Sequence, residues 1–84
     1  MKQYCETWAI AYERIYSFFQ QIEGIQFTED QFCFSSCKIV ITTLAPRMLG
    51  PVSVPQTQVE ISGPECEAQK IHHLFVMEFL SAGG

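Results

Sequence analysis

The chain has 84 residues, of which 48% are hydrophobic and 17% are charged, and its formal net charge is -4. A chain of this length forms one domain with a core that is only just sufficient, so we expect a single domain over residues 1–84. The acidic excess argues against nucleic acids and anionic membranes as partners, because a protein binds both of them through clustered basic side chains. The five basic residues are scattered: Lys2, Arg14, Lys38, Arg47 and Lys70.

The first predicted element is an amphipathic helix over residues 4–23. At about 100° per residue, one arc of this helix is apolar and rich in aromatic side chains, and the opposite arc is polar. Gly24 follows directly and can end the helix in the left-handed conformation. The expected inner arc consists of Tyr4, Trp8, Ala11, Tyr12, Ile15, Phe18, Phe19 and Ile22.

Strands are predicted next. Residues 25–27 and 31–34 are extended, with a turn or an irregular section at residues 28–30, although Thr28 and Gln31 are also spaced as a capping box that opens one helical turn. Ser35 and Ser36 are a weak hairpin signal. Residues 37–44 are rich in β-branched side chains and apolar on both faces, which predicts a central strand. Residues 56–62 alternate between apolar and polar side chains, as expected for a half-exposed strand.

Residues 45–55 are predicted to form an irregular loop. Prolines at three positions and Gly50 oppose a regular element, because proline lacks the amide donor of a strand and fixes φ. Loops of this length are often functional or become ordered on a partner. The residues near its tip are Arg47, Met48 and Leu49.

A second helix is predicted over residues 64–80, with Ser62 and Glu65 spaced as a capping box. The expected inner stripe is Ala68, Ile71, Phe75 and Phe79, with His72 and Val76 at its margin. The helix is apolar round more than half of its circumference, so a second apolar strip would be exposed in a monomer unless the proline-rich loop covers it through Met48, Leu49 and Val52. This strip consists of Leu74, Met77 and Leu80.

The expected fold is therefore α+β in the order α-β-β-β-α, with two helices packed on one face of a small antiparallel sheet. This order resembles that of double-stranded-RNA-binding domains. Residues 67–70 stand where that family carries a lysine cluster, and only Lys70 matches it. Without the cluster, the phosphate contacts that recognise A-form RNA would be missing, so RNA binding is a remote alternative.

Cysteine and histidine side chains suggest a zinc- or thiol-dependent protein as the main alternative. Cys33 and Cys37, together with His73 or His72, could supply zinc ligands, but three residues separate the two cysteines. Buried and unreactive cysteines are the more frequent arrangement in a reducing compartment, so we expect no metal and no other cofactor.

Catalytic motifs are missing from the sequence, which contains no nucleophile elbow, metalloprotease helix, P-loop or dinucleotide motif. Cys66 and His73 are the nearest approach to a nucleophile with its base. Seven residues on a helix correspond to about 10 Å along its axis, which is too far for a hydrogen bond. We therefore expect no enzymatic activity.

The sequence ends in Gly83 and Gly84, an ending that resembles those of ubiquitin-like proteins and thiocarboxylate sulfur carriers. Those families begin with a β-hairpin and carry the two glycines on a tail after a strand. This chain is predicted to begin and end with helices, so a carrier is a second remote alternative.

These observations lead us to expect a non-catalytic protein-association module, either a homodimer or one subunit of a larger complex. The absence of a secretory signal and of about 18 consecutive apolar residues suggests the cytoplasm. Arg47 is the best candidate to meet an anionic group, because it is the only charge in an apolar loop. The expected interface consists of Leu74, Met77, Leu80, Arg47, Met48 and Leu49.

Overall fold

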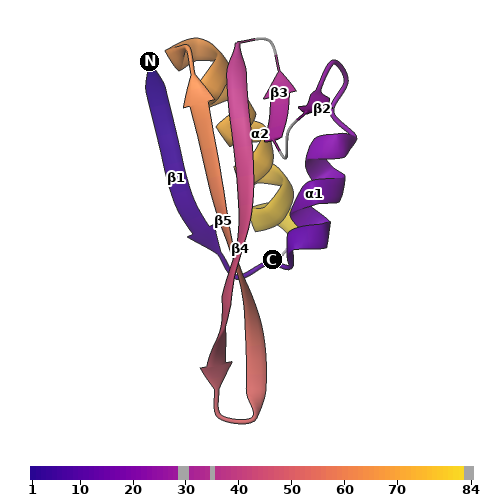
Figure 1. Cartoon of the computed structure of the whole chain (residues 1–84), viewed down its shortest axis with the longest axis vertical. Helices are drawn as coiled ribbons and strands as arrows, with labels where there is room; N and C mark the ends of the chain where they lie inside the picture. The colour runs from indigo at the N-terminus through magenta and orange to yellow at the C-terminus, as the bar shows by residue number, and fades with distance from the viewer. Residues whose placement is uncertain (29–30, 35, 83–84) are drawn as a thin grey trace.

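The computed structural model describes residues 1–28, 31–34 and 36–82. Within these residues, two helices accompany a five-stranded sheet in which every pair of neighbouring strands is antiparallel (Figure 1). The sheet order is β1 (Lys2–Trp8), β5 (Val52–Gly63), β4 (Cys37–Leu49), β3 (Gln31–Phe34) and β2 (Gln26–Thr28). The helices are α1 (Tyr12–Gln20) and α2 (Glu65–Ala82).

The N-terminal segment corrects the predicted helix over residues 4–23. Lys2–Trp8 forms β1, which pairs with β5, and α1 begins only at Tyr12. A spacing of four residues places Tyr4 and Trp8 on one face in a helix and in a strand alike, so this pattern does not distinguish the two structures. Pairing with β5 decides between them, because β1 satisfies backbone groups along a strand edge that would otherwise be unpaired.

The element order is therefore β-α-β-β-β-β-α. It confirms the α+β class and the antiparallel sheet, but it removes the α-β-β-β-α order on which the resemblance to double-stranded-RNA-binding domains rests. Strands β2 and β3 confirm the two extended segments before residue 35 and exclude the helical turn at Thr28 and Gln31. The predicted connection is residues 28–30, but Thr28 belongs to β2. Residues 29–30 lie outside the described residues, as do Ser35 of the hairpin signal and the terminal Gly83 and Gly84.

The predicted loop over residues 45–55 is instead the outer half of a long hairpin. Strands β4 and β5 stay paired as far as Leu49 and Val52, with an irregular register between Leu44 and Arg47. The two strands project beyond the helices and the other three strands as a twisted ribbon (Figure 1). We call residues 45–55 the hairpin arm.

The prolines of the hairpin arm lie where a strand tolerates them. Pro46 and Pro55 fall in the irregular section of the register, where no direct pair is formed. Pro51 and Gly50 lie in the turn, where Gly50 has a φ of 62° that a glycine adopts without strain. Proline is therefore tolerated in this hairpin, because a residue in a bulge or a turn does not have to donate a hydrogen bond to the neighbouring strand.

The core lies between one face of the sheet and the inner sides of both helices. Along β4 and β5 the buried side chains alternate with more exposed ones, and the directly paired Ile39 and Ile61 are 0% and 1% exposed. Phe75 of α2 is fully buried, and its ring stacks on Phe19 of α1 at a centroid distance of 5.5 Å. Both helices thus cover the same face, and the opposite face carries Gln3, Cys5, Thr7, Lys38, Val40, Thr42, Gln58 and Glu60.

Helix α2 confirms the predicted inner stripe, since Ala68, Ile71, Phe75 and Phe79 are all buried. Its start differs from the prediction: Ser62 belongs to β5, and the amide of Ala68 donates to the carbonyl of Pro64 as the helix begins. Ser62 therefore pairs within the sheet instead of capping α2 as predicted. Neither helix of the described chain combines the length and the apolar character that a membrane crossing requires.

A buried hydroxyl joins β5 to the connection between β1 and α1. Thr57 is 1% exposed, and its Oγ1 donates to the carbonyl oxygen of Ile10 at 2.6 Å. Thr57→Val removes this bond at nearly constant shape and is expected to lower the free energy of unfolding by about 1–2 kcal/mol, as measured by urea denaturation. Thr43→Val, at the exposed position paired with Thr57, is the control. Equal stability of the two variants would contradict this role of the hydroxyl.

Candidate association surface

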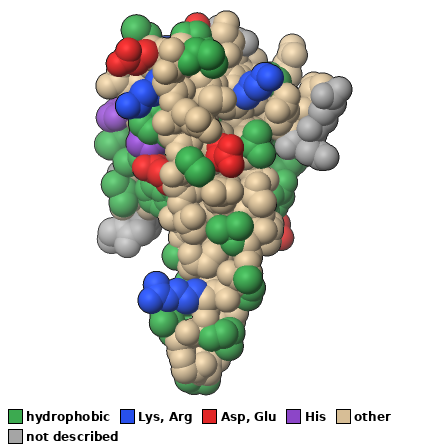
Figure 2. Space-filling view, turned by 60° about the vertical axis from the view of Figure 1, so that its left-hand side comes forward, with side chains coloured by type: hydrophobic (Ala, Val, Ile, Leu, Met, Phe, Trp, Pro, Cys, Tyr) green, Lys and Arg blue, Asp and Glu red, His purple; other side chains and the backbone are tan. Residues whose placement is uncertain are grey.

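The hairpin arm exposes apolar side chains far from the core. Met48, Leu49 and Val52 are 62%, 53% and 56% exposed. The pairs Leu49 with Val52 and Arg47 with Val54 place these four residues on one face of the ribbon, and Met48 lies on the other. In Figure 2, hydrophobic side chains follow the arm down to its tip. The arm therefore presents an aliphatic face with a single cation beside it.

The edges of the arm restrict how it can bind. An isolated two-stranded ribbon is only marginally stable in water, so contact with another surface would stabilise it. Pro46 and Pro55 lie on opposite strands near its base and cannot donate a ladder hydrogen bond. Contact through side chains is therefore favoured over the addition of another strand.

The second exposed surface lies on α2. Leu74, Met77 and Leu80 are 44%, 52% and 62% exposed, and we call them the outer strip. Steps of three residues turn by about 300°, so these side chains are spread round the outer side of the helix and not aligned in a row. Because Met48 and Leu49 are also more than half exposed, the hairpin arm does not cover the outer strip in the monomer, as one interpretation of the sequence allowed.

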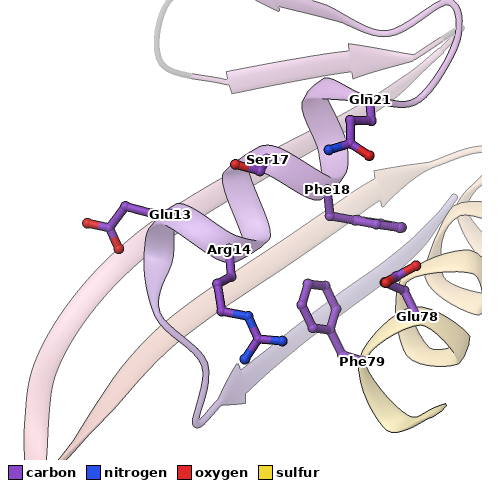
Figure 3. Close-up of a pocket in the computed structure, with 7 residues that line it drawn as sticks. All are labelled: Glu13, Arg14, Ser17, Phe18, Gln21, Glu78 and Phe79. Atoms are coloured by element: carbon purple, nitrogen blue, oxygen red, sulfur yellow. The ribbon is translucent and has the colours of Figure 1, made fainter. Parts of the chain in front are cut away.

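A groove of about 390 Å³ lies between α1 and the last turns of α2, and we call it the helix groove. Its apolar walls are Phe18 and Phe79, and the guanidinium of Arg14 lies 5.8 Å from the centre of the Phe79 ring (Figure 3). Glu13 of α1 and Glu78 of α2 are the two carboxylates in its lining. The sequence places Glu13 and Arg14 on a polar helix surface, but it does not indicate that α2 would lie beside them.

A second, smaller groove of about 250 Å³ lies at the base of the hairpin arm, and we call it the base groove. It is bounded by the start of α1, through Tyr12 and Glu13, and by the hairpin, through Leu44, Pro46 and Pro55. Glu13 lines both grooves, so they adjoin along the first turn of α1.

A histidine–carboxylate pair joins α2 to β1. His72 Nε2 lies 2.9 Å from Glu6 Oε1, and the indole N–H of Trp8 donates to the same oxygen at 3.3 Å. The Tyr4 ring stacks on His72 with a centroid distance of 4.0 Å. Each group in this cluster has an apolar or hydrogen-bonding partner, and the contacts between His72 and both Tyr4 and Glu6 hold α2 against β1. The cluster is therefore a structural contact.

The structure does not bring the suggested metal ligands together. Cys33 pairs with Lys38, and Cys37 with Phe34, so the two thiols lie on opposite faces of the sheet. His73 is exposed on α2. Among the residues that the structure describes, no group of three histidine, cysteine or acidic side chains is placed to hold a metal ion.

Cys37 is also unsuited to thiol chemistry. It is 1% exposed, and its Sγ lies 4.0 Å from Glu67 Oε2. Burial, with a smaller contribution from the charge of Glu67, raises the pKa of the Cys37 thiol. The reactive thiolate is therefore disfavoured at this position.

Alkylation of the folded protein is expected to distinguish the four cysteines. Cys5 and Cys66 are exposed, Cys33 is partly exposed and Cys37 is buried. With iodoacetamide, we expect Cys37 to react at least about tenfold more slowly than Cys66, because it must wait for local opening of the fold. Peptide mass spectrometry measures each rate, and the urea-unfolded chain is the control. Equal rates for Cys37 and Cys66 in the folded protein would contradict the buried position.

Comparison with known proteins gives no further guide to function, since the sequence matches no protein-family model and no curated protein. The features of the fold that bear on function are the hairpin arm, the outer strip and the two grooves.

Proposed function

We propose that the chain is a non-catalytic protein-association module that binds its partner through the hairpin arm, with the outer strip of α2 as a second contact. The observation that carries this proposal is the arm itself. Its aliphatic side chains project away from the core, where they add little to the stability of the monomer. If they were buried against another protein, these side chains would stabilise the complex.

Approximate energies support contact through more than one surface. Full burial of an aliphatic side chain contributes about 1.5–3 kcal/mol, so Leu49 and Val52, which are half-exposed and share one face of the arm, would contribute roughly 2 kcal/mol more on binding. Association costs about 4 kcal/mol or more in lost translational and rotational freedom. The arm alone does not offset this cost, and the outer strip or another face must take part.

The compartment that we propose is the cytoplasm. All four cysteines are free thiols in the fold, and two of them, Cys5 and Cys66, are exposed. Exposed free thiols suit a reducing compartment, where they are not driven into disulfides. No observation favours the zinc, RNA-binding or carrier alternatives, so we propose none of them.

Site-specific photo-crosslinking in the cells that make the protein tests the association proposal. A benzophenone amino acid at position 49 keeps the arm apolar, and the same amino acid at Thr42, exposed on the uncovered face of the sheet, is the control. We expect a protein adduct from position 49 and little or none from position 42. A third probe at Met77 tests the outer strip separately.

The adduct is identified by mass spectrometry, and it can contain a second copy or another protein. No protein adduct from position 49, or equal yields from positions 49 and 42, would overturn the proposal that the arm is the contact surface.

A further inference from the structure

We propose that the partner is a second copy of this chain, and that the hairpin arm of each copy lies along the base groove and the helix groove of the other. This inference rests on the association function proposed above and assigns its partner. It follows from the charge, the length and the position of the arm.

The arm differs in charge from the rest of the chain. The arm carries Arg47 and no acidic residue, and no Asp or Glu occurs anywhere between residues 31 and 59. All nine acidic residues therefore lie outside this stretch, and two of them, Glu13 and Glu78, line the helix groove. Two copies with a net charge of -4 each repel when other faces meet. An arm seated in the helix groove instead brings a cation to a lining that holds two carboxylates and one cation, Arg14, and is therefore acidic on balance.

The aliphatic face of the arm also matches the groove. Leu49 and Val52 lie on the same face of the ribbon as Arg47, so they can contact an apolar surface while the guanidinium reaches a carboxylate beside it. The helix groove offers this combination, because the rings of Phe18 and Phe79 form its walls and Glu78 lies beside them (Figure 3).

The position of the arm allows both contacts to form at once. The arm leaves the body at the end where α1 begins and α2 ends (Figure 1). A two-fold axis near this point reverses the direction of the partner's arm, which then runs from the base groove along α1 into the helix groove. The five residues 45–49 span about 17 Å, close to the roughly 14 Å length of nine-residue α1. The result is a closed dimer with two identical contacts.

Sedimentation velocity on the purified, reduced protein tests the dimer. At about 100 µM we expect a species of twice 9.6 kDa. Arg47→Glu places like charges in both contacts and is expected to weaken the dimer at least about tenfold. The groove variant Glu13→Arg/Glu78→Arg is expected to do the same. Lys38→Glu makes the same charge change as Arg47→Glu on the uncovered face of the sheet and should leave the dimer intact.

A mixture of the two weakened variants gives the sharpest result. In the mixed dimer, the arm that carries the Arg47→Glu substitution meets the arginine-bearing groove, and the unchanged arm meets the unchanged groove, so both contacts are complementary. We expect an equimolar mixture to dimerise with nearly the wild-type dissociation constant. All three substituted positions are exposed, and circular dichroism checks that each variant is folded.

Three outcomes would overturn the inference: a wild-type monomer at about 100 µM, a dimer that Arg47→Glu leaves unchanged, or a mixture that stays monomeric. The first outcome is distinguishable from failure of the proposed function. If the protein is monomeric but the probe at position 49 captures a different protein, association through the arm stands and self-association is excluded.

Discussion

Replacing Phe75 with alanine is expected to remove a large part of the stability of this fold. Phe75 is 0% exposed, and its ring contacts Trp8 of β1 at a centroid distance of 5.0 Å and Phe19 of α1 at 5.5 Å. Truncation leaves a cavity where three elements meet, which typically costs about 3–5 kcal/mol. Small domains are stable by about 5–15 kcal/mol in general, and this chain has little core in reserve.

Urea denaturation followed by circular dichroism measures this loss, and Leu74→Ala provides a matched control on the same helix. Leu74 is 44% exposed, so its truncation is expected to cost less than about 1 kcal/mol in the monomer. Similar losses for the two variants would contradict the orientation of α2 and, with it, the assignment of the outer strip. Measurements at low protein concentration keep any dimer from adding to the stability.

Helix α2 shows what the sequence can predict. Four buried positions repeat at spacings of three and four residues over a long segment, and this pattern fits only a helix with one buried side. The exposure of Leu74, Met77 and Leu80 follows from the same periodicity. Local pattern is sufficient here because the helix is long and every inner residue contributes to the signal.

The N-terminal strand shows where local pattern fails. Tyr4 and Trp8 are compatible with helix and strand, and the choice depends on pairing with residues 57–63 of β5, which lie at the other end of the sequence. Pairing of this kind leaves no periodic signal in the first strand itself. The helix groove is not predictable from the sequence for the same reason, because α1 and the end of α2 become neighbours only after the sheet has formed.

The prediction for the hairpin arm fails for a different reason. Its residues Arg47, Met48 and Leu49 are exposed, but the prolines suggest an irregular loop where the structure has a paired hairpin. A bulge that accommodates proline is a property of two strands together, and one strand alone does not reveal it. The composition thus indicates an exposed apolar segment, whereas its shape as a projecting ribbon depends on the register of β4 and β5.

Gly63→Ala is the second substitution expected to have a large effect. A Cβ at this position would lie 2.7 Å from Cys37 Sγ, 2.9 Å from Cys37 Cα and 3.1 Å from the carbonyl oxygen of Ser36. Two of these three atoms belong to the backbone, so rotation of the thiol does not relieve the contact. We expect the free energy of unfolding to fall by about 1–3 kcal/mol, as for other overpacked cores.

Gly50→Ala is the matched control, because both glycines have a positive φ, 157° at Gly63 and 62° at Gly50, but no atom lies within 4 Å of the position that the Gly50 Cβ would occupy. It should lose only about 1 kcal/mol, from backbone strain in the turn of the hairpin arm. The double variant Gly63→Ala/Cys37→Ala removes the sulfur but leaves both backbone contacts, so we expect it to recover only part of the loss relative to Cys37→Ala alone. Full recovery would show that the thiol is the sole obstacle. The close approach of β4 to the last residue of β5, which positions the start of α2, would then be looser than the structure describes.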